Sequence, residues 1–130
     1  MKAVKGLVGG PFKDEQSFKA AVLKKWRREY PAQTFFEVEN EEKEPGMPDV
    51  LGIGGHNQAG FYEFKISDGH GVVEFQKTQP LFYRRHCRLL IKILAWDVPR
   101  GRVVGMEAAE VVEAKSLRIK IPEVLDEQAV

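Results

Sequence analysis

The sequence predicts an α/β domain in which a mixed central β-sheet is flanked by helices. The first observation is the order of elements: one helical pattern, three strand-like segments, a second helical pattern and a strongly apolar strand. The second is composition, because 43% hydrophobic and 10% aromatic residues suffice for a folded core. A chain of 130 residues fits one domain, so we expect a single domain over residues 1–130.

The first helix is predicted from Asp14 to Tyr30. Asp14 is a favourable N-cap, and Pro31 disfavours helical geometry in the residue before it. The apolar residues at four-residue spacing are Phe18, Val22 and Trp26. Glu15 lies three residues before Phe18, so we expect this carboxylate to share the inward apolar stripe, which is unusual for a charged group.

Three strands are predicted after this helix, at residues 34–39, 49–53 and 61–66. The acidic run at 40–46 is interpreted as a loop, and the glycine-rich run at 54–60 as a turn. The second and third strands are therefore expected to pair as a hairpin.

The second half of the core begins with a glycine-rich loop at residues 67–72. Thr78 is then expected to cap a helix. That helix carries Gln79, Phe82, Tyr83 and His86. The apolar run 89–96 is typical of a central strand buried on both faces. Beyond it we expect a turn at 99–101 and a short helix at 107–114, while the tail after Lys115 is weakly informative.

Three charged residues interrupt the predicted hairpin. Side chains alternate across a strand, so Glu63 and Lys65 share one face of the third strand. If the register puts Asp49 beside Glu63, two carboxylates and an amine converge at one end of the sheet. Directly opposed residues lie about 4.5–5.5 Å apart, and carboxylates that close repel unless one is protonated or a cation lies between them. A hard divalent ion such as Mg²⁺ meets this need, because it prefers oxygen ligands.

These residues, with Glu15 on the first helix and Gln79 on the second, resemble the PD-(D/E)xK nuclease superfamily. The pattern is similar to its VRR-NUC and Holliday-junction-resolvase-like branch. The segments that carry this likeness are Gly46-Met47-Pro48-Asp49 and Gln76-Lys77-Thr78-Gln79. The resemblance covers about residues 14–96, which we take as the core, and leaves 97–130 as an extension. It implies a restriction-endonuclease-like α-β-β-β-α-β core.

The resemblance also implies a metal-dependent nuclease that hydrolyses phosphodiester bonds, an endonuclease rather than an exonuclease. The implied Mg²⁺ ligands, for which Mn²⁺ can substitute, are Asp49, Glu63, the backbone carbonyl of Phe64 and Glu15, the last directly or through water. Lys65 is implied to position or deprotonate the attacking water, or to stabilise charge at phosphorus. Gln79 is implied to orient Lys65 or the attacked phosphate.

The net charge of +1 does not indicate a partner, and the distribution of charge fits either phosphate-binding faces near a cation site or ordinary solvated helix faces. Residues 13–28 hold six basic and two acidic side chains, residues 77–92 hold five basic and no acidic ones, and residues 37–44 hold five glutamates and one lysine. The candidate nucleic-acid-binding residues are Lys24, Lys25, Arg28, Lys77, Arg84, Arg85 and Arg88. The expected substrate is DNA, including branched, flap or junction DNA, and the sequence does not discriminate it from RNA. The resolvase-like resemblance suggests a homodimer.

Each assignment has an alternative. Asp49 can simply begin a strand, Glu63 and Lys65 can form a solvated strand face, Glu15 can serve the helix dipole, and Gln79 can be an exposed first-turn residue. For the whole protein, the alternatives are a non-catalytic nucleic-acid-binding module with a nuclease-like fold and an ordinary interaction domain.

Several classes of site are disfavoured. The single cysteine, Cys87, excludes an intramolecular disulfide and a cysteine-based zinc site. Gly52–Gly55 is not followed by Gly-Lys-Ser/Thr, so it is not a phosphate-binding loop. The three histidines, interpreted as solvated or partly buried residues, are His56, His70 and His86. The sequence has neither a signal peptide pattern nor a membrane-length apolar segment, so a cytoplasmic protein is expected.

Overall fold

The computed structural model describes residues 1–39, 41, 43–54 and 59–128. The strands within them are β1 (Lys2–Val4), β2 (Thr34–Glu37), β3 (Val50–Ile53), β4 (Ala59–Ile66), β5 (Val72–Glu74), β6 (Leu90–Asp97), β7 (Arg102–Glu107), β8 (Arg118–Lys120) and β9 (Glu127–Gln128). The helices are α1 (Glu15–Glu29), α2 (Thr78–Arg85) and α3 (Ala108–Ala114). Parts of the predicted 40–46 loop and of the predicted 54–60 turn, including His56, lie outside the described residues.

One mixed sheet organises the molecule. Its strand order is β2-β3-β4-β6-β7-β1-β9, and β5 pairs with β8 in a separate two-stranded sheet. Strands β3 and β4 are antiparallel neighbours, as the predicted hairpin requires, whereas β4 and β6 run parallel. The predicted α/β class and mixed sheet are therefore confirmed, and β6 lies at the centre of the sheet.

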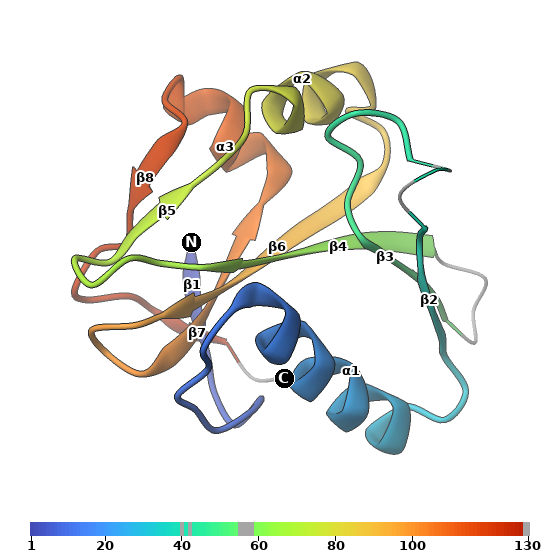
Figure 1. Ribbon diagram of the computed structural model, residues 1–130, viewed down its shortest axis with the longest axis horizontal. Coiled ribbons are helices and arrows are strands. Elements are labelled where there is room, and N and C mark those ends of the chain that lie inside the picture. The colour runs from blue at the N-terminus through green and yellow to red at the C-terminus, as the bar shows by residue number, and fades with distance from the viewer. Residues whose placement is uncertain (40, 42, 55–58, 129–130) are drawn as a thin grey trace.

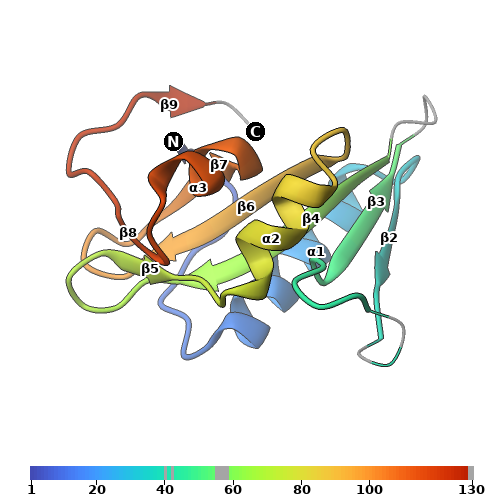
Figure 2. The ribbon, with the colours of Figure 1, turned by 90° about the horizontal axis from the view of Figure 1, so that it is seen from above.

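Helices cover both faces of this sheet (Figure 1). Helix α1 packs on one face, while α2 and α3 pack on the other together with the β5–β8 pair. Figure 2, seen from above, shows α2 and α3 in front of the sheet and α1 behind it. Two hydrophobic clusters result, one on each face, and the predicted core residues Trp26 and Trp96 both belong to the α1 cluster. The parallel pair of β4 and β6 separates these two clusters.

Helix α1 begins as its sequence predicts. Asp14 accepts a hydrogen bond from the backbone N–H of Ser17 at 2.7 Å, and Ser17 completes a capping box. Such a cap pairs backbone N–H groups of the first turn that have no partner inside the helix. The inward stripe of Phe18, Val22, Leu23 and Trp26 is buried. At 15 residues, α1 is the longest helix of the described segments, and none of those helices has the length and apolar character needed to cross a bilayer.

Some helices and strands begin or end at other residues than the sequence pattern predicts, because pairing between strands decides where a strand ends. Strand β2 stops at Glu37, because its partner β3 starts only at Val50. Thr78 is the first residue of α2 rather than its cap; the N-cap is Lys77, which makes no side-chain capping bond. The helix predicted at 107–114 is observed as α3. The short strands β1, β5, β8 and β9 were not predicted, because partners distant in sequence create them. The longer β7 was not predicted either, although it forms a hairpin with β6 across the predicted turn at 99–101.

Candidate active site

The hairpin register brings Asp49 and Glu63 to neighbouring positions. The ladder between β3 and β4 ends with the pair Val50 and Tyr62, and the residues that follow on the two segments are Asp49 and Glu63. Asp49 keeps one more sheet contact, because its carbonyl accepts a hydrogen bond from the N–H of Val38 at 2.8 Å. The condition set by the sequence, that the register place these acids side by side, is therefore met.

The charged face of β4 is buried. Phe64 points toward α1, where its ring lies 5.8 Å from that of Phe18. Glu63 and Lys65 point to the opposite face, and each is only 6% exposed. The predicted alternation of β4 is confirmed, and the alternative of a solvated strand face is wrong. A buried carboxylate and a buried ammonium require partners, because an unpaired charge in the interior is strongly unfavourable.

Gln79 supplies partners to both charges. Its Oε1 accepts from Lys65 Nζ at 2.9 Å and from the backbone N–H of Gln76 at 2.8 Å. Its Nε2 donates to Glu63 Oε1 at 2.6 Å. Gln79 is 6% exposed, so the alternative of an exposed first-turn residue is wrong. Because both donors fix which end of the amide is oxygen, the side chain holds Glu63 and Lys65 in one arrangement.

Glu63 has one oxygen without a partner. Its Oε2 is buried and has no hydrogen bond within the described part of the chain. The pKa of Glu63 is raised to about 7, mainly by burial and next by the neighbouring Asp49 carboxylate. The ammonium groups of Lys65 and Lys43 oppose this rise, whereas Glu15 adds to it. Glu63 is therefore a carboxyl group that is ready to accept an additional positive or hydrogen-bonding partner.

Asp49 faces a pocket at the end of α1. The pocket has a volume of about 510 Å³ and is lined by Asp14, Glu15, Gln16, Lys19, Asp49, Phe64 and Ile66. A second pocket, of about 300 Å³, shares Glu15 and Ile66 with it. Since one water molecule takes about 30 Å³ in the liquid, the first pocket alone has room for a hydrated ion and a phosphate group.

The position of Glu15 differs from its prediction. Glu15 is the first residue of α1 and is exposed, so it does not share the inward stripe. A side chain in the first turn has no preceding turn to pack on, and this one lines both pockets instead. The N-terminus of α1 thus places the Glu15 carboxylate on the pocket that Asp49 also lines, at the solvent-exposed side of the site.

The donor set fits a hard cation. Carboxylates of Asp49 and Glu63 on adjacent strands, the unpartnered Glu63 Oε2 and the pocket-lining residue Phe64 provide oxygen atoms of the kind that Mg²⁺ prefers. Across the described ranges, no group of three or more His, Cys, Asp or Glu side chains has the arrangement of a complete metal site.

Sequence reasoning missed Tyr83 as a site residue. It follows Gln79 by four positions on α2, so both side chains share one helix face. Tyr83 is 2% exposed, and its hydroxyl has no partner among the described residues. Burial raises its pKa, and the carboxylates of Glu63 and Asp49 raise it further. The signal in the sequence was this four-residue spacing from Gln79.

The basic candidates divide between the two faces of the sheet. Lys24, Lys25 and Arg28 belong to α1, whereas Arg84 and Arg85 belong to α2. Lys77 and Arg88 flank α2 and are exposed. Within the described part of the chain, two of the seven have acidic partners: Lys25 pairs with Glu29 at 2.8 Å, and Arg85 lies 3.5 Å from Glu44. A nucleic acid that contacted both sets would have to span the sheet edge at the site.

The remaining histidines and the cysteine lie apart from Glu63. His70 is exposed, as expected of a loop residue, and Cys87 is exposed as well. His86 is partly buried; its ring lies 4.3 Å from that of Phe82, and its Nε2 is 2.9 Å from Glu44 Oε2. Its contacts therefore tie α2 to the segment before Asp49.

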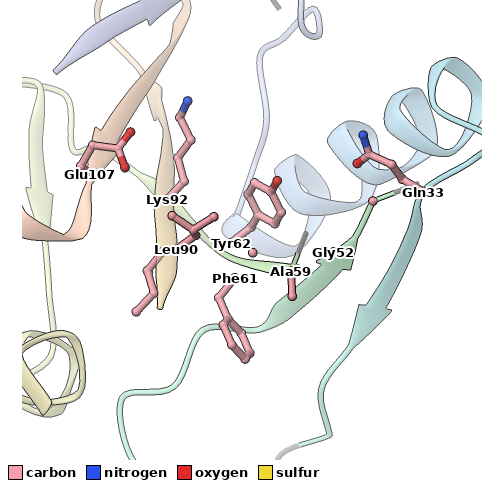
Figure 3. A pocket seen from close by; sticks show the side chains of 11 residues that line it. Gln33, Gly52, Ala59, Phe61, Tyr62, Leu90, Lys92 and Glu107 are labelled. Atoms are coloured by element: carbon pink, nitrogen blue, oxygen red, sulfur yellow. The ribbon is translucent and has the colours of Figure 1, made fainter. Parts of the chain in front are cut away.

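The opposite end of β4 carries a different kind of pocket (Figure 3). Glycines and the side chains of Gln33, Tyr62, Lys92 and Glu107 line this space of about 230 Å³. Glu107 is the only carboxylate among its described lining residues. The paired acids are therefore found only at the Glu63 end of the strand among these described pocket residues.

Comparisons of the chain with protein-family models, with curated proteins and with solved structures found no match.

Proposed function

We propose that this protein is a Mg²⁺-dependent nuclease that hydrolyses phosphodiester bonds of DNA. The single observation that carries the proposal is the juxtaposition of Asp49 and Glu63 at neighbouring positions of the hairpin, with the second oxygen of Glu63 buried and without a partner among the described residues. An oxygen of this kind costs free energy in the interior unless it is paired. A divalent cation shared with Asp49 removes that cost.

The residues that would hold the cation are Asp49, Glu63 and the backbone carbonyl of Phe64, with Glu15 acting through water. The bound ion would supply Lewis acidity for activating water and neutralising charge on the phosphate. The burial of Glu63 keeps this carboxylate away from competing water, while Asp49 and Glu15 border the open pocket. The acids therefore span the boundary between the core and the space for substrate.

Lys65 would act on the phosphate or on the attacking water. Its amine is held by Gln79 at 2.9 Å and lies 5.1 Å from the centroid of the Phe75 ring, so its direction is fixed before substrate arrives. A preorganised positive charge stabilises developing negative charge without reorganisation. Gln79 is thus a positioning residue that couples Lys65 to Glu63.

The finer proposals concern substrate and assembly. Exposed lysines and arginines near both helices support binding of nucleic-acid backbones without readout of sequence. We include branched, flap and junction DNA in this proposal, with a homodimer as the assembly that cuts two strands symmetrically.

The test is a cleavage assay on a panel of substrates. Purified wild-type protein, Asp49→Asn and Glu29→Gln would be incubated with labelled duplex, single-stranded, flap and four-way-junction DNA, and with matching RNA. Each reaction would contain Mg²⁺, Mn²⁺ or a chelator. Glu29→Gln is a matched control, because Glu29 lies at the far end of α1 and pairs with Lys25. We expect metal-dependent cleavage by wild type and Glu29→Gln, and a loss of at least about 100-fold in Asp49→Asn.

The panel also separates the alternatives. Binding without cleavage, equal in metal and chelator, would favour the non-catalytic nucleic-acid-binding module. Cleavage that survives in Asp49→Asn would show that the activity arises elsewhere in the chain or from a contaminant. Neither binding nor cleavage across all substrates would favour an ordinary interaction domain.

A further inference from the structure

A lysine outside the predicted site lies against Asp49. Lys43 Nζ forms an ion pair with Asp49 Oδ1, and the two side chains are 18% and 36% exposed. Lys43 is the one basic residue in the acidic stretch 37–44. The proposed chemistry does not use this amine, yet the proposed cation would bind the same carboxylate.

The segment that carries Lys43 is fastened to α2. The next residue, Glu44, contacts His86 Nε2 at 2.9 Å, and the carbonyl of Glu44 accepts from the N–H of Met47 at 3.0 Å. Gly46 has a φ of +86° and packs so closely that a Cβ there would lie 2.0 Å from the carbonyl oxygen of Thr78. These contacts direct Lys43 toward Asp49, although the segment has no regular secondary structure.

Two lysine side chains offset much of the negative charge at this corner of the sheet. Glu15, Asp49 and Glu63 bring three carboxylates, and Lys43 and Lys65 bring two ammonium groups, all close enough to affect the ionisation of Glu63. Lys65 is buried and engaged by Gln79, whereas Lys43 contacts the more exposed acid. Two cations on one carboxylate repel each other strongly at short range. Lysine carries a compact charge on a flexible stem, so its amine can leave while the backbone stays anchored.

We infer that Lys43 is the resident counter-ion of Asp49 and that a divalent cation must displace its ammonium group in order to bind; this inference rests on the proposed function. In the metal-free protein, Lys43 holds the Asp49 carboxylate beside Glu63 and reduces the repulsion between the acids. When a cation binds, the ammonium group moves away from Asp49. Lys43 is therefore a positioning residue that sets the metal concentration at which the site is filled.

The experiment measures Mn²⁺ binding rather than cleavage. Free Mn²⁺ would be followed by electron paramagnetic resonance during titration of wild type, Lys43→Met, Lys43→Arg and Asp49→Asn. The control is Lys5→Met, which removes an ion pair with Glu127 at 2.6 Å in another part of the sheet. We expect Lys43→Met to bind Mn²⁺ about tenfold more tightly than wild type, and Lys43→Arg and Lys5→Met to match wild type. In chelator, Lys43→Met should melt below wild type, and saturating Mn²⁺ should raise its Tm more.

The possible failures are distinguishable. Equal or weaker Mn²⁺ binding by folded Lys43→Met, beside Asp49-dependent binding by wild type, overturns the counter-ion inference and leaves the proposed function intact. Mn²⁺ binding by neither wild type nor Lys43→Met overturns the proposed function itself. If circular dichroism shows that Lys43→Met is unfolded, Lys43→Gln takes its place, and the same tenfold tightening of Mn²⁺ binding is required.

Discussion

Two buried carboxylates lie on adjacent parallel strands and have opposite surroundings. Asp97, the last residue of β6, is fully buried and receives hydrogen bonds from Arg102 Nε at 2.9 Å and from Arg100 Nη1 at 3.2 and 3.3 Å. Both of its oxygens are satisfied. Glu63 on β4 has one oxygen bound to Gln79 and the other without a partner within the described residues.

The difference separates a structural acid from a candidate functional one. Arg100 lies in the turn between β6 and β7, and Arg102 is the first residue of β7, so their ion pairs with Asp97 hold that turn closed. Glu63 is paired with a neutral amide, and the nearest charges include the carboxylate of Asp49. A half-satisfied buried acid is unfavourable for folding, and such groups gather where a ligand completes the set.

The largest expected effect comes from breaking the satisfied cluster. Asp97→Asn should lower the free energy of unfolding by about 3 kcal/mol, because it removes the charge that compensates two partly buried guanidinium groups. Urea unfolding at pH 7, in chelator, measures this loss. A loss below about 1 kcal/mol would contradict the view that this cluster is structural, since that range is typical of exposed ion pairs.

Glu63→Gln should raise the free energy of unfolding, whereas Asp97→Asn lowers it. Because the pKa of Glu63 in the folded protein is about 7 against an ordinary 4.5, the folded state retains a proton that the unfolded state releases between those values. Stability therefore falls as pH rises from about 4.5 to about 7, by about 1.4 kcal/mol for each pKa unit.

The variant lacks this titration. In chelator, the free energy of unfolding of Glu63→Gln should exceed that of wild type by about 3 kcal/mol at pH 8 and match it near pH 4. Urea unfolding at both pH values tests this, and Mn²⁺ should stabilise wild type but not the variant. Parallel pH profiles for the two proteins would mean that Glu63 does not retain a proton in the fold.

Gln79→Ala should change stability by less than Asp97→Asn and Glu63→Gln do, and should lower cleavage. It leaves Lys65 and the N–H of Gln76 without an acceptor, so we expect a loss of about 1.5 kcal/mol in stability and about 100-fold in cleavage. Gln76→Ala is the matched control, because it keeps the backbone donor and removes only an exposed side chain. An equal loss of cleavage in both variants would sink the positioning role of Gln79.

The features of the fold and site that follow from strand alternation, hairpin pairing and helix capping could be predicted from the sequence. Alternation along β4 put Glu63 and Lys65 on one face, and the hairpin with β3 limited the register enough to put Asp49 beside Glu63. Gln79 was predicted through a resemblance, and its contacts with both charges now support that choice on physical grounds. The α1 helix was predictable from its cap and its apolar spacing.

The remaining features depend on contacts that no local pattern encodes. Lys43 reaches Asp49 from an irregular segment held by a glycine contact with α2, and a single lysine among glutamates does not indicate such a contact. Strand β1 has three residues and exists because β7, about 100 residues later, pairs with it. Burial of the Tyr83 hydroxyl depends on how α2 packs over β4, and therefore on tertiary structure alone.

Tyr83→Phe should have the smallest effect on stability, and it sharpens the comparison most. Removing a buried hydroxyl that lacks a partner among the described residues should leave the free energy of unfolding unchanged or raise it by up to about 1 kcal/mol. Cleavage should nevertheless fall about tenfold if the hydroxyl contacts the substrate or an ordered water in the active complex. Tyr62→Phe, on the opposite face of β4, is the control and should cleave like wild type. Equal cleavage by Tyr83→Phe and wild type would make Tyr83 a packing residue. Loss of cleavage without loss of stability would show that the Tyr83 hydroxyl, like Glu63 Oε2, finds its partner only in the active complex.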